Sequence, residues 1–417
     1  MIRNISLVCD KHVQHLCNFR IVRVMIKDGE VYLNSVHPEY KLGPTQFAGF
    51  LAELYEASKV FRLPDVEFAY NGDDDANWAF DWRDRGKLQT NFHGGPFPLV
   101  AWSKSERSSA ILIPDSGAFR CMHDGFDNFL QRMADIQAVA WSTRKQVAFG
   151  RWTKFCPLYM LLGQPRLPSG EPYKCPRAWL PAVSNEFPEM LDAGFVHGGD
   201  DPPPEGDPRY KEPIPISHQV KYRYLVSTDG VATSRKMEVY FLFGSLVIKS
   251  ASDRLGYFYD ALRPDQHFVT CLNSSARDII DVVRWARSHD AEARRIAETA
   301  QRFASEHLHR SARLCQIRTV IEELGKRMRY TPDCSRRELC IPLGHFVSFL
   351  SRHGRVRGVC DWQELIDRYP PSNATVQTFT TSSEYAIANL ISNKQFWPRD
   401  NDYPPLEMEP YFGVPRM

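Results

Sequence analysis

A glycine, a serine and two basic residues follow a strand-like run in the middle of the chain, in an order that suits phosphate binding. After the run at 222–226 comes Gly230, which permits close backbone approach, and then Ser234, which can cap a helix. The free amides at a helix start attract anions, and Arg235 and Lys236 add positive charge. A departing diphosphate needs fixed donors and cations of this kind. The alternative is an ordinary capped helix with two solvated basic residues.

A second set of residues suited to chemistry is the acidic turn Asp73-Asp74-Asp75, which follows a strand-like run at 66–70. Clefts in open α/β sheets lie at the carboxyl ends of strands. One carboxylate could act as the general base that takes a proton from an attacking hydroxyl. Asp73 and Asp75 could instead hold a divalent metal on a nucleotide diphosphate. A solvated acidic turn without chemistry is the third interpretation.

Other catalytic classes find no motif in the sequence. The thirteen histidines include no His-Glu-x-x-His spacing, and Ser103 and Ser245 lack the Gly-x-Ser-x-Gly setting of a hydrolase. Neither a Gly-x-Gly-x-x-Gly nor a Gly-Lys-Ser/Thr loop occurs. The sequence therefore gives no support for a zinc hydrolase, for hydride transfer or for ATP hydrolysis.

The elements that would position these residues are those of an α/β protein. Apolar periodicity and turn residues predict a first lobe with a hairpin at 19–36, a helix at 45–61, a strand at 65–70, apolar runs at 98–102 and 110–113, and a helical stretch at 126–141. The second lobe is predicted to contain strands at 220–226 and 246–248 and helices at 234–243, at 276–288 and from 290 onward. Its order of strand, turn, helix and strand is that of an α/β unit.

Two stretches show no regular pattern. Residues 165–212 are rich in Pro, Gly and Asp, which predicts a surface insertion. Beyond residue 330 the periodicity is weak, and the end of the chain at 396–417 is expected to be irregular. Because 417 residues exceed the usual size of a single core, we predict an N-terminal lobe at 1–145, a C-terminal lobe at 146–330, and an extension of unknown role at 331–417.

Composition restricts the possible partners and surroundings. Lys and Arg number 52 against 50 Asp and Glu, which gives no argument for nucleic-acid binding. No apolar run is long enough to span a bilayer, and we expect no targeting segment in the chain as given. The ten cysteines form no Cys-x-x-Cys pair, so structural zinc is not expected. Sequons at Asn4, Asn273 and Asn373 suit a secretory protein, but such short motifs also arise by chance.

Several segments resemble the signature of glycosyltransferase family 90, the Rumi-like and capsule-associated glycosyltransferases, in both order and spacing. They are Leu63-Pro64-Asp65, Asn71 with Asp74, residues 98–104, Lys221-Tyr222-Arg223-Tyr224-Leu225, Asp229-Gly230-Val231-Ala232-Thr233-Ser234, Gly244-Ser245-Leu246-Val247, Phe258-Tyr259, Leu262, Pro264, His267-Phe268, and Ile296-Ala297-Glu298. The resemblance covers most of the chain, from about Cys17 to Leu308.

This resemblance implies a GT-B-like fold of two Rossmann-like lobes with the active site in the cleft between them. It implies a UDP-sugar donor held mainly by the C-terminal half, and inversion at the anomeric carbon without an essential metal or other cofactor. Asp74 aligns with the family's catalytic base. Gly230, Ser234, Arg235 and Lys236 then bind the donor diphosphate.

Two positions depart from the family pattern. Arg151 lies in Phe149-Gly150-Arg151-Trp152, where the family usually has an Arg-Gly-Ser-like motif near the phosphates, and its role in donor binding is open. Lys236 stands where the family has Arg, so it supplies charge without bidentate geometry. Tyr259 and His267 are expected to line the donor pocket, with core packing as the alternative.

The function that follows is transfer of glucose or xylose from UDP-glucose or UDP-xylose to a hydroxyl, here expected to be a protein Ser. By the resemblance, such a glycoprotein-modifying enzyme works in the lumen of the endoplasmic reticulum or Golgi. A glycan-directed transferase of capsule or wall synthesis and a non-catalytic nucleotide- or glycan-binding relative stay open as alternatives. The expected partners are a UDP-sugar and a protein or glycan acceptor, without nucleic acid and without a membrane span in this chain.

Overall fold

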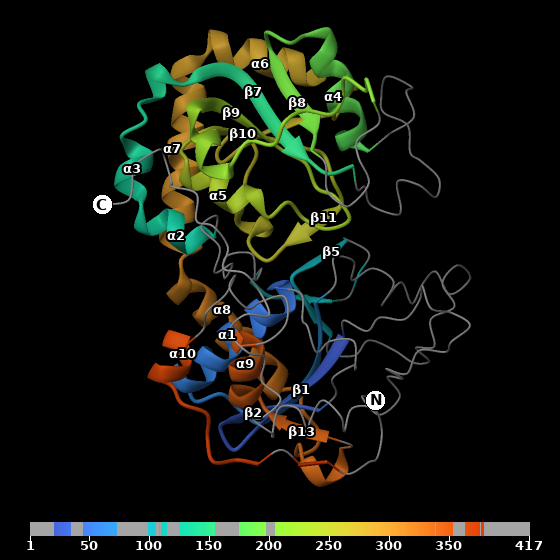
Figure 1. The fold of residues 1–417 in the computed structure, drawn as a ribbon, viewed down its shortest axis with the longest axis vertical. Coiled ribbons are helices and arrows are strands. Elements are labelled where there is room, and N and C mark those ends of the chain that lie inside the picture. Colours follow the sequence, from blue (N-terminus) through green and yellow to red (C-terminus); the bar gives the residue numbers. More distant parts are fainter. Residues whose placement is uncertain are drawn as a thin grey trace, which may run out of the picture. The chain divides into compact units, whose positions relative to one another are not determined.

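The computed structural model describes residues 21–34, 45–72, 99–105, 108, 110–114, 125–154, 175–196, 205–337, 339–352, 363–375 and 377–378. Contacts divide the chain into two compact units (Figure 1). Unit 1 comprises Met1–Gly125 and Arg310–Met408, and unit 2 comprises Phe126–His309 and Glu409–Met417. This division assigns residues 126–145 to unit 2 and residues 310–330 to unit 1, whereas the sequence placed the boundaries at 145 and 330.

Unit 1 is built on a mixed sheet with the strand order β14-β13-β2-β1-β3-β4-β6. The strands of the unit are β1 (Ile21–Lys27), β2 (Glu30–Leu33), β3 (Val66–Asn71), β4 (Leu99–Ala101), β5 (Ser103–Ser105), β6 (Ile111–Leu112), β13 (Leu339–Pro342) and β14 (Gln377–Thr378). β1 pairs antiparallel with both β2 and β3, while β3, β4 and β6 run parallel. The predicted hairpin is confirmed: Asp28 and Gly29 both have positive φ, as a two-residue hairpin turn requires.

Helices from distant parts of the sequence cover this sheet. They are α1 (Thr45–Val60), α8 (Arg310–Gly325), α9 (Leu343–Arg352) and α10 (Gln363–Arg368), with the 3₁₀ turn η10 at Cys334–Arg336. Figure 1 shows α8 and α9, in orange, beside the blue α1, and one apolar core joins residues from all of them. The weak pattern beyond residue 330 therefore gave no sign of β13 and α9, and the expected irregular tail at 396–417 lies outside the described residues. The short segments of β13 and α9 are stabilised by pairing with β2 and packing on α1, which a local pattern does not show.

Unit 2 is built on a five-stranded parallel sheet with the order β12-β10-β9-β7-β8. The strands of the unit are β7 (Lys145–Trp152), β8 (Leu191–Phe195), β9 (Tyr222–Ser227), β10 (Leu246–Ser250), β11 (Arg254–Gly256) and β12 (Val269–Cys271). The chain moves outward from β7 to β8 and then returns to the other side of β7 to form β9. This reversal is the topological switch point of a doubly wound sheet, where ligands bind at the carboxyl ends of the strands.

The helices of unit 2 confirm most of the predicted elements. They are α2 (Phe126–Gln131), α3 (Met133–Gln137), α4 (Pro176–Glu186), α5 (Lys236–Leu242), α6 (Asp278–Ser288) and α7 (Asp290–His307), with 3₁₀ turns η6 (Trp141–Thr143), η8 (Ile216–Lys221) and η9 (Tyr259–Ala261). The core of this unit gathers apolar residues from the strands and from α4, α6 and α7. None of the helices in the described ranges is both long and apolar enough to cross a membrane.

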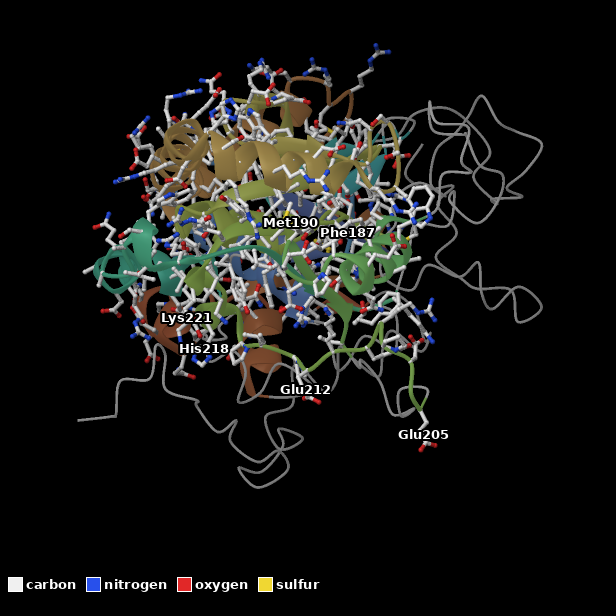
Figure 2. The ribbon with its side chains drawn as sticks, turned by 90° about the horizontal axis from the view of Figure 1, so that it is seen from above. Phe187, Met190, Glu205, Glu212, His218 and Lys221 are labelled. Atoms are coloured by element: carbon white, nitrogen blue, oxygen red, sulfur yellow. A yellow bond between two sulfur atoms is a disulfide. The ribbon has the colours of Figure 1, made fainter. Side chains whose placement is uncertain are left out.

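The interpretation of residues 165–212 as a surface insertion is wrong for α4 and β8. β8 pairs along its length with β7, and Leu191, Ala193 and Phe195 are buried. Its apolar residues alternate with Asp192 and Gly194, and a proline lies inside α4, so the composition hid both elements. A surface segment does precede β9: Figure 2 shows Glu205, Glu212, His218 and Lys221 along it.

Candidate functional site

The arginine side chain of Arg177 lies at the switch point of the unit 2 sheet. Arg177 is the second residue of α4, and its guanidinium donates to the carbonyl of Thr153, just after β7, at 3.4 Å and to that of Thr228, just after β9, at 3.1 Å. The Trp152 indole in turn donates to the Arg177 carbonyl at 3.1 Å. A cation is thus fixed between the carboxyl ends of the two strands at which the sheet reverses.

Gly230 lies directly against this guanidinium. A Cβ atom at position 230 would stand 2.7 Å from Cζ of Arg177, closer than real Cβ contacts allow. The sequence predicted that Gly230 permits a close approach, and the structure shows that Arg177 is one group that makes it. Any larger residue at position 230 would displace the guanidinium from the switch point.

Three buried hydroxyl groups lie at the carboxyl ends of β9 and β10. Ser227, Thr228 and Ser250 are each at most 2% exposed, and their side-chain oxygens have no hydrogen-bond partner among the residues that the structure describes. β9 and β10 are neighbours, with Ser227 opposite Lys249. Leaving a buried hydroxyl unsatisfied costs about 1–3 kcal/mol, so groups of this kind call for an explanation. A polar ligand at the strand ends would provide one.

A buried carboxylate organises the loop between β9 and α5. Asp229 accepts from the ammonium of Lys249 at 2.8 Å and from the backbone amide of Ser234 at 2.8 Å. The Tyr259 hydroxyl lies 3.5 Å from the same carboxylate, and the Lys249 ammonium lies 5.1 Å from the centroid of the Tyr259 ring. The Lys249 charge balances that of Asp229, so the loop carries no net negative charge into the switch point.

The structure brings most of the predicted donor-binding residues to this loop, with some of their groups already engaged. The amide of Ser234 binds Asp229, and α5 begins at Lys236, one residue later than a Ser234 cap would place it. Lys236 donates from its ammonium to the carbonyl of Arg151 at 2.6 Å, and Arg235 immediately precedes the helix. Their contacts with a diphosphate stay predictions.

Arg151 directs its guanidinium away from Lys236. It forms an ion pair with Asp192 of β8 at 3.0 Å, donates to the carbonyls of Asp192 and Glu212, and stacks on Phe149 with Cζ 4.6 Å from the ring centroid. The side chain is buried and joins β7 to β8 and to the segment before β9. These contacts explain Arg151 as a structural residue without reference to a ligand.

Tyr259 and His267 differ in their surroundings. Tyr259 belongs to the cluster around Asp229 described above. His267 packs edge-on against Phe303 of α7, with ring centroids 5.3 Å apart, and its Nδ1 accepts from the amide of Arg263 at 3.0 Å. Burial lowers the pKa of His267 below the ordinary histidine value. The structure thus gives His267 a packing partner, and its predicted place in the donor pocket stays a prediction.

The predicted catalytic base, Asp74, and its neighbours Asp73 and Asp75 lie outside the described residues. The strand before them is as predicted: β3 ends at Asn71, which is fully buried and lies opposite Ala101 of the parallel β4. Among the described residues, no group of three or more His, Cys, Asp and Glu side chains is placed to hold a metal ion.

Sequence reasoning missed Arg177, because it lies in the stretch taken for an insertion. One signal was available. Pro176 and Arg177 follow Cys175, and a proline in the first turn marks a helix start. If that helix is the one after the first strand of a doubly wound sheet, a basic residue in its first turn points to the crevice where anions bind.

Comparisons with known proteins place these features in a family. The sequence profile described as "Glycosyl transferase family 90" matches residues 4–343. Protein O-glucosyltransferase 3 of Homo sapiens is 26% identical over 317 residues, which are 75% of this chain and 56% of that protein. The O-glucosyltransferase rumi of Drosophila pseudoobscura pseudoobscura is 24% identical over 290 residues, 65% of this chain and 63% of that protein. The chain thus spans little more than half the length of these curated relatives.

Solved structures with partial similarity include Anabaena Alr3699/HepE in complex with UDP and glucose. It is 14% identical, with a TM-score of 0.29, over 46% of this chain and 52% of that one. Sucrose-phosphate synthase from Thermosynechococcus elongatus is 13% identical, with a TM-score of 0.30, over 47% and 49% of the two chains. TM-scores this low support no conclusion about this chain.

Proposed function

We propose that this chain, which belongs to glycosyl transferase family 90, transfers glucose or xylose from a UDP-sugar to a hydroxyl group, with a protein serine as the first choice of acceptor. The observation that carries the proposal is the guanidinium of Arg177, fixed against Gly230 at the switch point of a doubly wound sheet. The names of the curated relatives, protein O-glucosyltransferases, support both glucose and a protein acceptor.

The donor half of the reaction needs a site for a diphosphate that leaves with extra negative charge. Arg177 and Lys236 bring two cations to the same region, one after β7 and one at the start of α5. A guanidinium offers a planar fork of donors that matches phosphate oxygens, and Lys236 adds a point charge. Fixed cations stabilise the developing charge without reorganising during the step. We therefore assign the diphosphate to these two residues, beside Gly230, Ser234 and Arg235.

The acceptor half of the reaction needs one general base in a single inverting displacement. We assign this role to Asp74, which follows the carboxyl end of β3, the kind of position at which ligands approach an α/β sheet. In this proposal unit 2 is the donor lobe and unit 1 the acceptor lobe of a GT-B-like enzyme. Two cations on the diphosphate make a metal ion unnecessary for the reaction.

The proposed cellular setting is the lumen of the endoplasmic reticulum or Golgi. In unit 1, Cys334 and Cys340 form a disulfide, and Cys175 of unit 2 is also disulfide-bonded. Disulfides form and persist in oxidising compartments. A luminal location also matches a transferase that modifies proteins on their way to the cell surface.

The deciding experiment measures UDP binding and UDP release for the wild type, Arg177→Ala and Asp74→Asn, with EDTA present and with small serine-bearing domains and free sugars as acceptors. Arg177→Ala should weaken UDP binding about 10- to 100-fold, because a charged hydrogen-bond donor is lost. Asp74→Asn should abolish turnover while UDP binding is kept.

The control is Arg209→Ala, which removes an exposed arginine of unit 2 that pairs with Asp207. This variant should leave UDP binding and UDP release unchanged. Activity that disappears with EDTA would show that a metal ion takes part. Unchanged UDP binding in Arg177→Ala would remove the central assignment. UDP binding by the wild type without turnover of any donor would favour a non-catalytic nucleotide-binding protein.

A further inference from the structure

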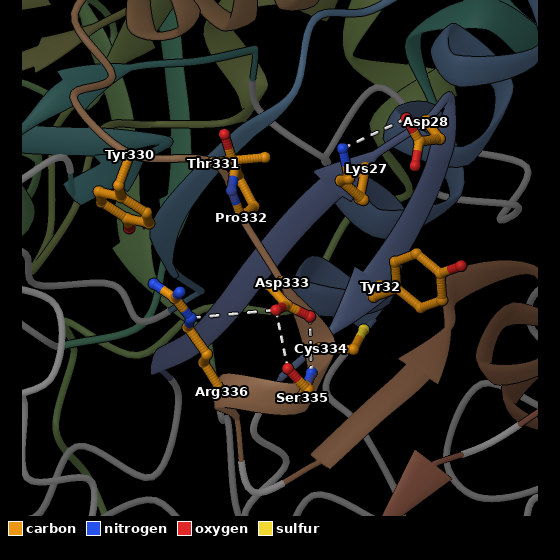
Figure 3. Close-up of a pocket in the computed structure, with 10 residues that line it drawn as sticks. All are labelled: Lys27, Asp28, Tyr32, Tyr330, Thr331, Pro332, Asp333, Cys334, Ser335 and Arg336. Atoms are coloured by element: carbon orange, nitrogen blue, oxygen red, sulfur yellow. Dashed lines mark hydrogen bonds and ion pairs between the residues drawn. The ribbon is translucent and has the colours of Figure 1, made fainter.

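Unit 1 contains a polar hollow whose lining shares no residue with the proposed donor site. It lies between the β1–β2 hairpin and residues 330–336, here called the 330–336 strip, and has a volume of about 730 Å³ (Figure 3). Small-molecule sites commonly enclose about 300–1,000 Å³, so the hollow is large enough for a ligand of several rings.

The hollow lies at the amino-terminal end of β3, and the described part of this strand ends away from it at Asn71. The hairpin turn next to Lys27 is adjacent to Asp65, just before β3 begins, whereas Asp74 follows the end of β3 at Asn71. Six residues of strand span roughly 20 Å. A ligand in the hollow would therefore lie about that far from the carboxyl end of β3.

The charged side chains that line the hollow balance one another. Lys27 pairs with Asp65 at 2.6 Å and with Asp28 at 3.2 Å, and Arg336 lies 3.9 Å from Asp333. Two cations and two anions contribute to the lining, so neither a phosphate nor a metal ion finds a surplus of opposite charge. What the lining offers is a set of hydrogen-bond donors and acceptors held in place by their mutual contacts.

Two tyrosine rings supply the apolar part of the surface. Tyr330 is 43% exposed, although its hydroxyl donates to the buried carboxylate of Glu67 at 2.8 Å, so the ring is held while part of its surface stays in contact with solvent. Tyr32 of β2 is half-buried. Figure 3 shows the two rings on opposite sides of the 330–336 strip. Burial raises the pKa of both phenols, so both stay neutral at physiological pH.

The strip itself is tied down. Asp333 accepts from the amide and the hydroxyl of Ser335, and Arg337 binds the same Glu67 carboxylate as Tyr330. The Cys334–Cys340 disulfide joins the strip to β13, which pairs with β2. A site that is ordered before binding loses less entropy when a ligand arrives.

From these features we propose that the hollow is a binding site for a neutral oligosaccharide of two or more sugar units. Pyranose rings present C–H faces that pack on aromatic rings and hydroxyl groups that both donate and accept hydrogen bonds, which matches separated tyrosines among balanced charges. The site does not depend on the proposed donor site. It gives the chain a means of holding a glycan on residues of unit 1 that the proposed donor site does not use.

The test titrates the full chain with cellotriose, xylotriose, maltotriose and chitotriose by calorimetry and by saturation-transfer NMR. At least one trisaccharide should bind, and Tyr330→Ala should weaken that binding about tenfold because a packing surface is removed. The matched control is Val60→Ala, which truncates another large exposed apolar residue of unit 1, 48% exposed at the end of α1, and should leave binding unchanged.

A second variant and two further measurements test the proposal even if Tyr330→Ala does not fold. Arg336→Ala removes an exposed side chain and should weaken binding a few-fold, while UDP affinity stays at the wild-type value in both variants. Binding of a neutral sugar should also be the same at low and high salt. The proposal is wrong if none of the four sugars binds at 10 mM or below, roughly the weakest affinity worth measuring. Competition by UDP, or an affinity that neither variant changes, would equally overturn it.

Discussion

The two units of this protein use their charged residues in different ways. In unit 1, buried ion pairs join segments that are far apart in sequence: Glu53 of α1 pairs with Arg313 of α8 at 2.7 Å, and Glu67 of β3 pairs with Arg337. In unit 2, the buried pair Asp229–Lys249 joins residues only 20 positions apart at the ends of adjacent strands, whereas its longer-range pairs, Arg151–Asp192 and Arg223–Asp290, leave the carboxylate partly exposed. Charge holds a discontinuous unit together in the first case and shapes a loop at the candidate site in the second.

This difference follows from how each unit is assembled. Apart from its last nine residues, unit 2 is a continuous stretch whose parallel sheet is completed by neighbouring βα segments. Unit 1 needs the C-terminal segment to extend its sheet and to cover α1. Unit 1 should therefore respond most to the loss of its long-range ties, and unit 2 to changes at its loops.

The largest expected effect is the loss of the Glu53–Arg313 pair. Both side chains are fully buried, so Arg313→Met leaves the Glu53 carboxylate without its main counter-charge and should reduce the free energy of unfolding by about 3–5 kcal/mol. Hydrogen exchange read by mass spectrometry should show the loss of protection in α1 and α8. Adding Glu53→Leu to Arg313→Met should restore much of the stability, because a packed apolar pair replaces an unpaired charge.

The matched control is Arg294→Met in unit 2, where the Arg294–Glu298 pair is 57% and 48% exposed on α7. An exposed pair of this kind contributes about 0–1 kcal/mol. Equal losses for Arg313→Met and Arg294→Met would contradict the view that buried charge pairs hold unit 1 together.

The next largest effect is expected from the disulfide of unit 1. Replacing both Cys334 and Cys340 by Ser should reduce the free energy of unfolding by about 2 kcal/mol, because the cross-link closes only a short loop of the unfolded chain. Urea unfolding with and without a reductant measures the change: reductant should destabilise the wild type by more than this double variant, in which the disulfide of Cys175 can still be reduced. A wild type insensitive to reductant would show that the bridge contributes little to unit 1.

The same contrast explains how much of the fold the sequence predicted. The hairpin around Asp28 and Gly29, helix α1 and the series β9, α5, β10 all have local patterns, and all are confirmed. β8 and β13 were missed because each is a short strand stabilised by a partner strand, β7 or β2, and β8 also lies in a stretch rich in Pro, Gly and Asp. Long-range pairing of this kind leaves little trace in a local window.

For the candidate site, the sequence predicted the loop and missed its best-placed cation. Gly230, Lys236 and Tyr259 do lie at or beside the carboxyl ends of the central strands. Arg177 was missed because α4 was not predicted. The place of Arg177 at the switch point depends on this helix lying beside it, and no sequence motif indicates that position. Asp74 lies outside the described residues, so its role rests on the family resemblance and on its place after β3.

A smaller effect, confined to unit 2, is expected for Gly230→Ala. The new methyl group would meet the Arg177 guanidinium at 2.7 Å and displace it from the switch point, so UDP affinity should fall about tenfold. Stability should change little, because the displaced group is the far end of a flexible side chain. Calorimetric titration with UDP measures the affinity, and thermal unfolding checks the fold. Arg209→Ala, an exposed change elsewhere in unit 2, is the control, and its UDP affinity should equal that of the wild type.

The smallest expected effect is a pH dependence of unit 2 stability through His267. Burial lowers the pKa of this side chain in the folded protein, so as the pH falls below the ordinary histidine value of about 6.5 the unfolded chain binds the proton first. The contribution of His267 to stability is therefore fully present above that pH and is lost as the pH falls toward the lowered pKa. His267→Gln cannot titrate, so its midpoint of thermal unfolding should decline less than that of the wild type between about pH 7 and pH 5.

Because other histidines titrate in both proteins, the difference between the two pH profiles isolates position 267. Parallel profiles would mean that His267 is as accessible to protons in the folded protein as in the unfolded chain, which would place it at an open pocket instead of against Phe303.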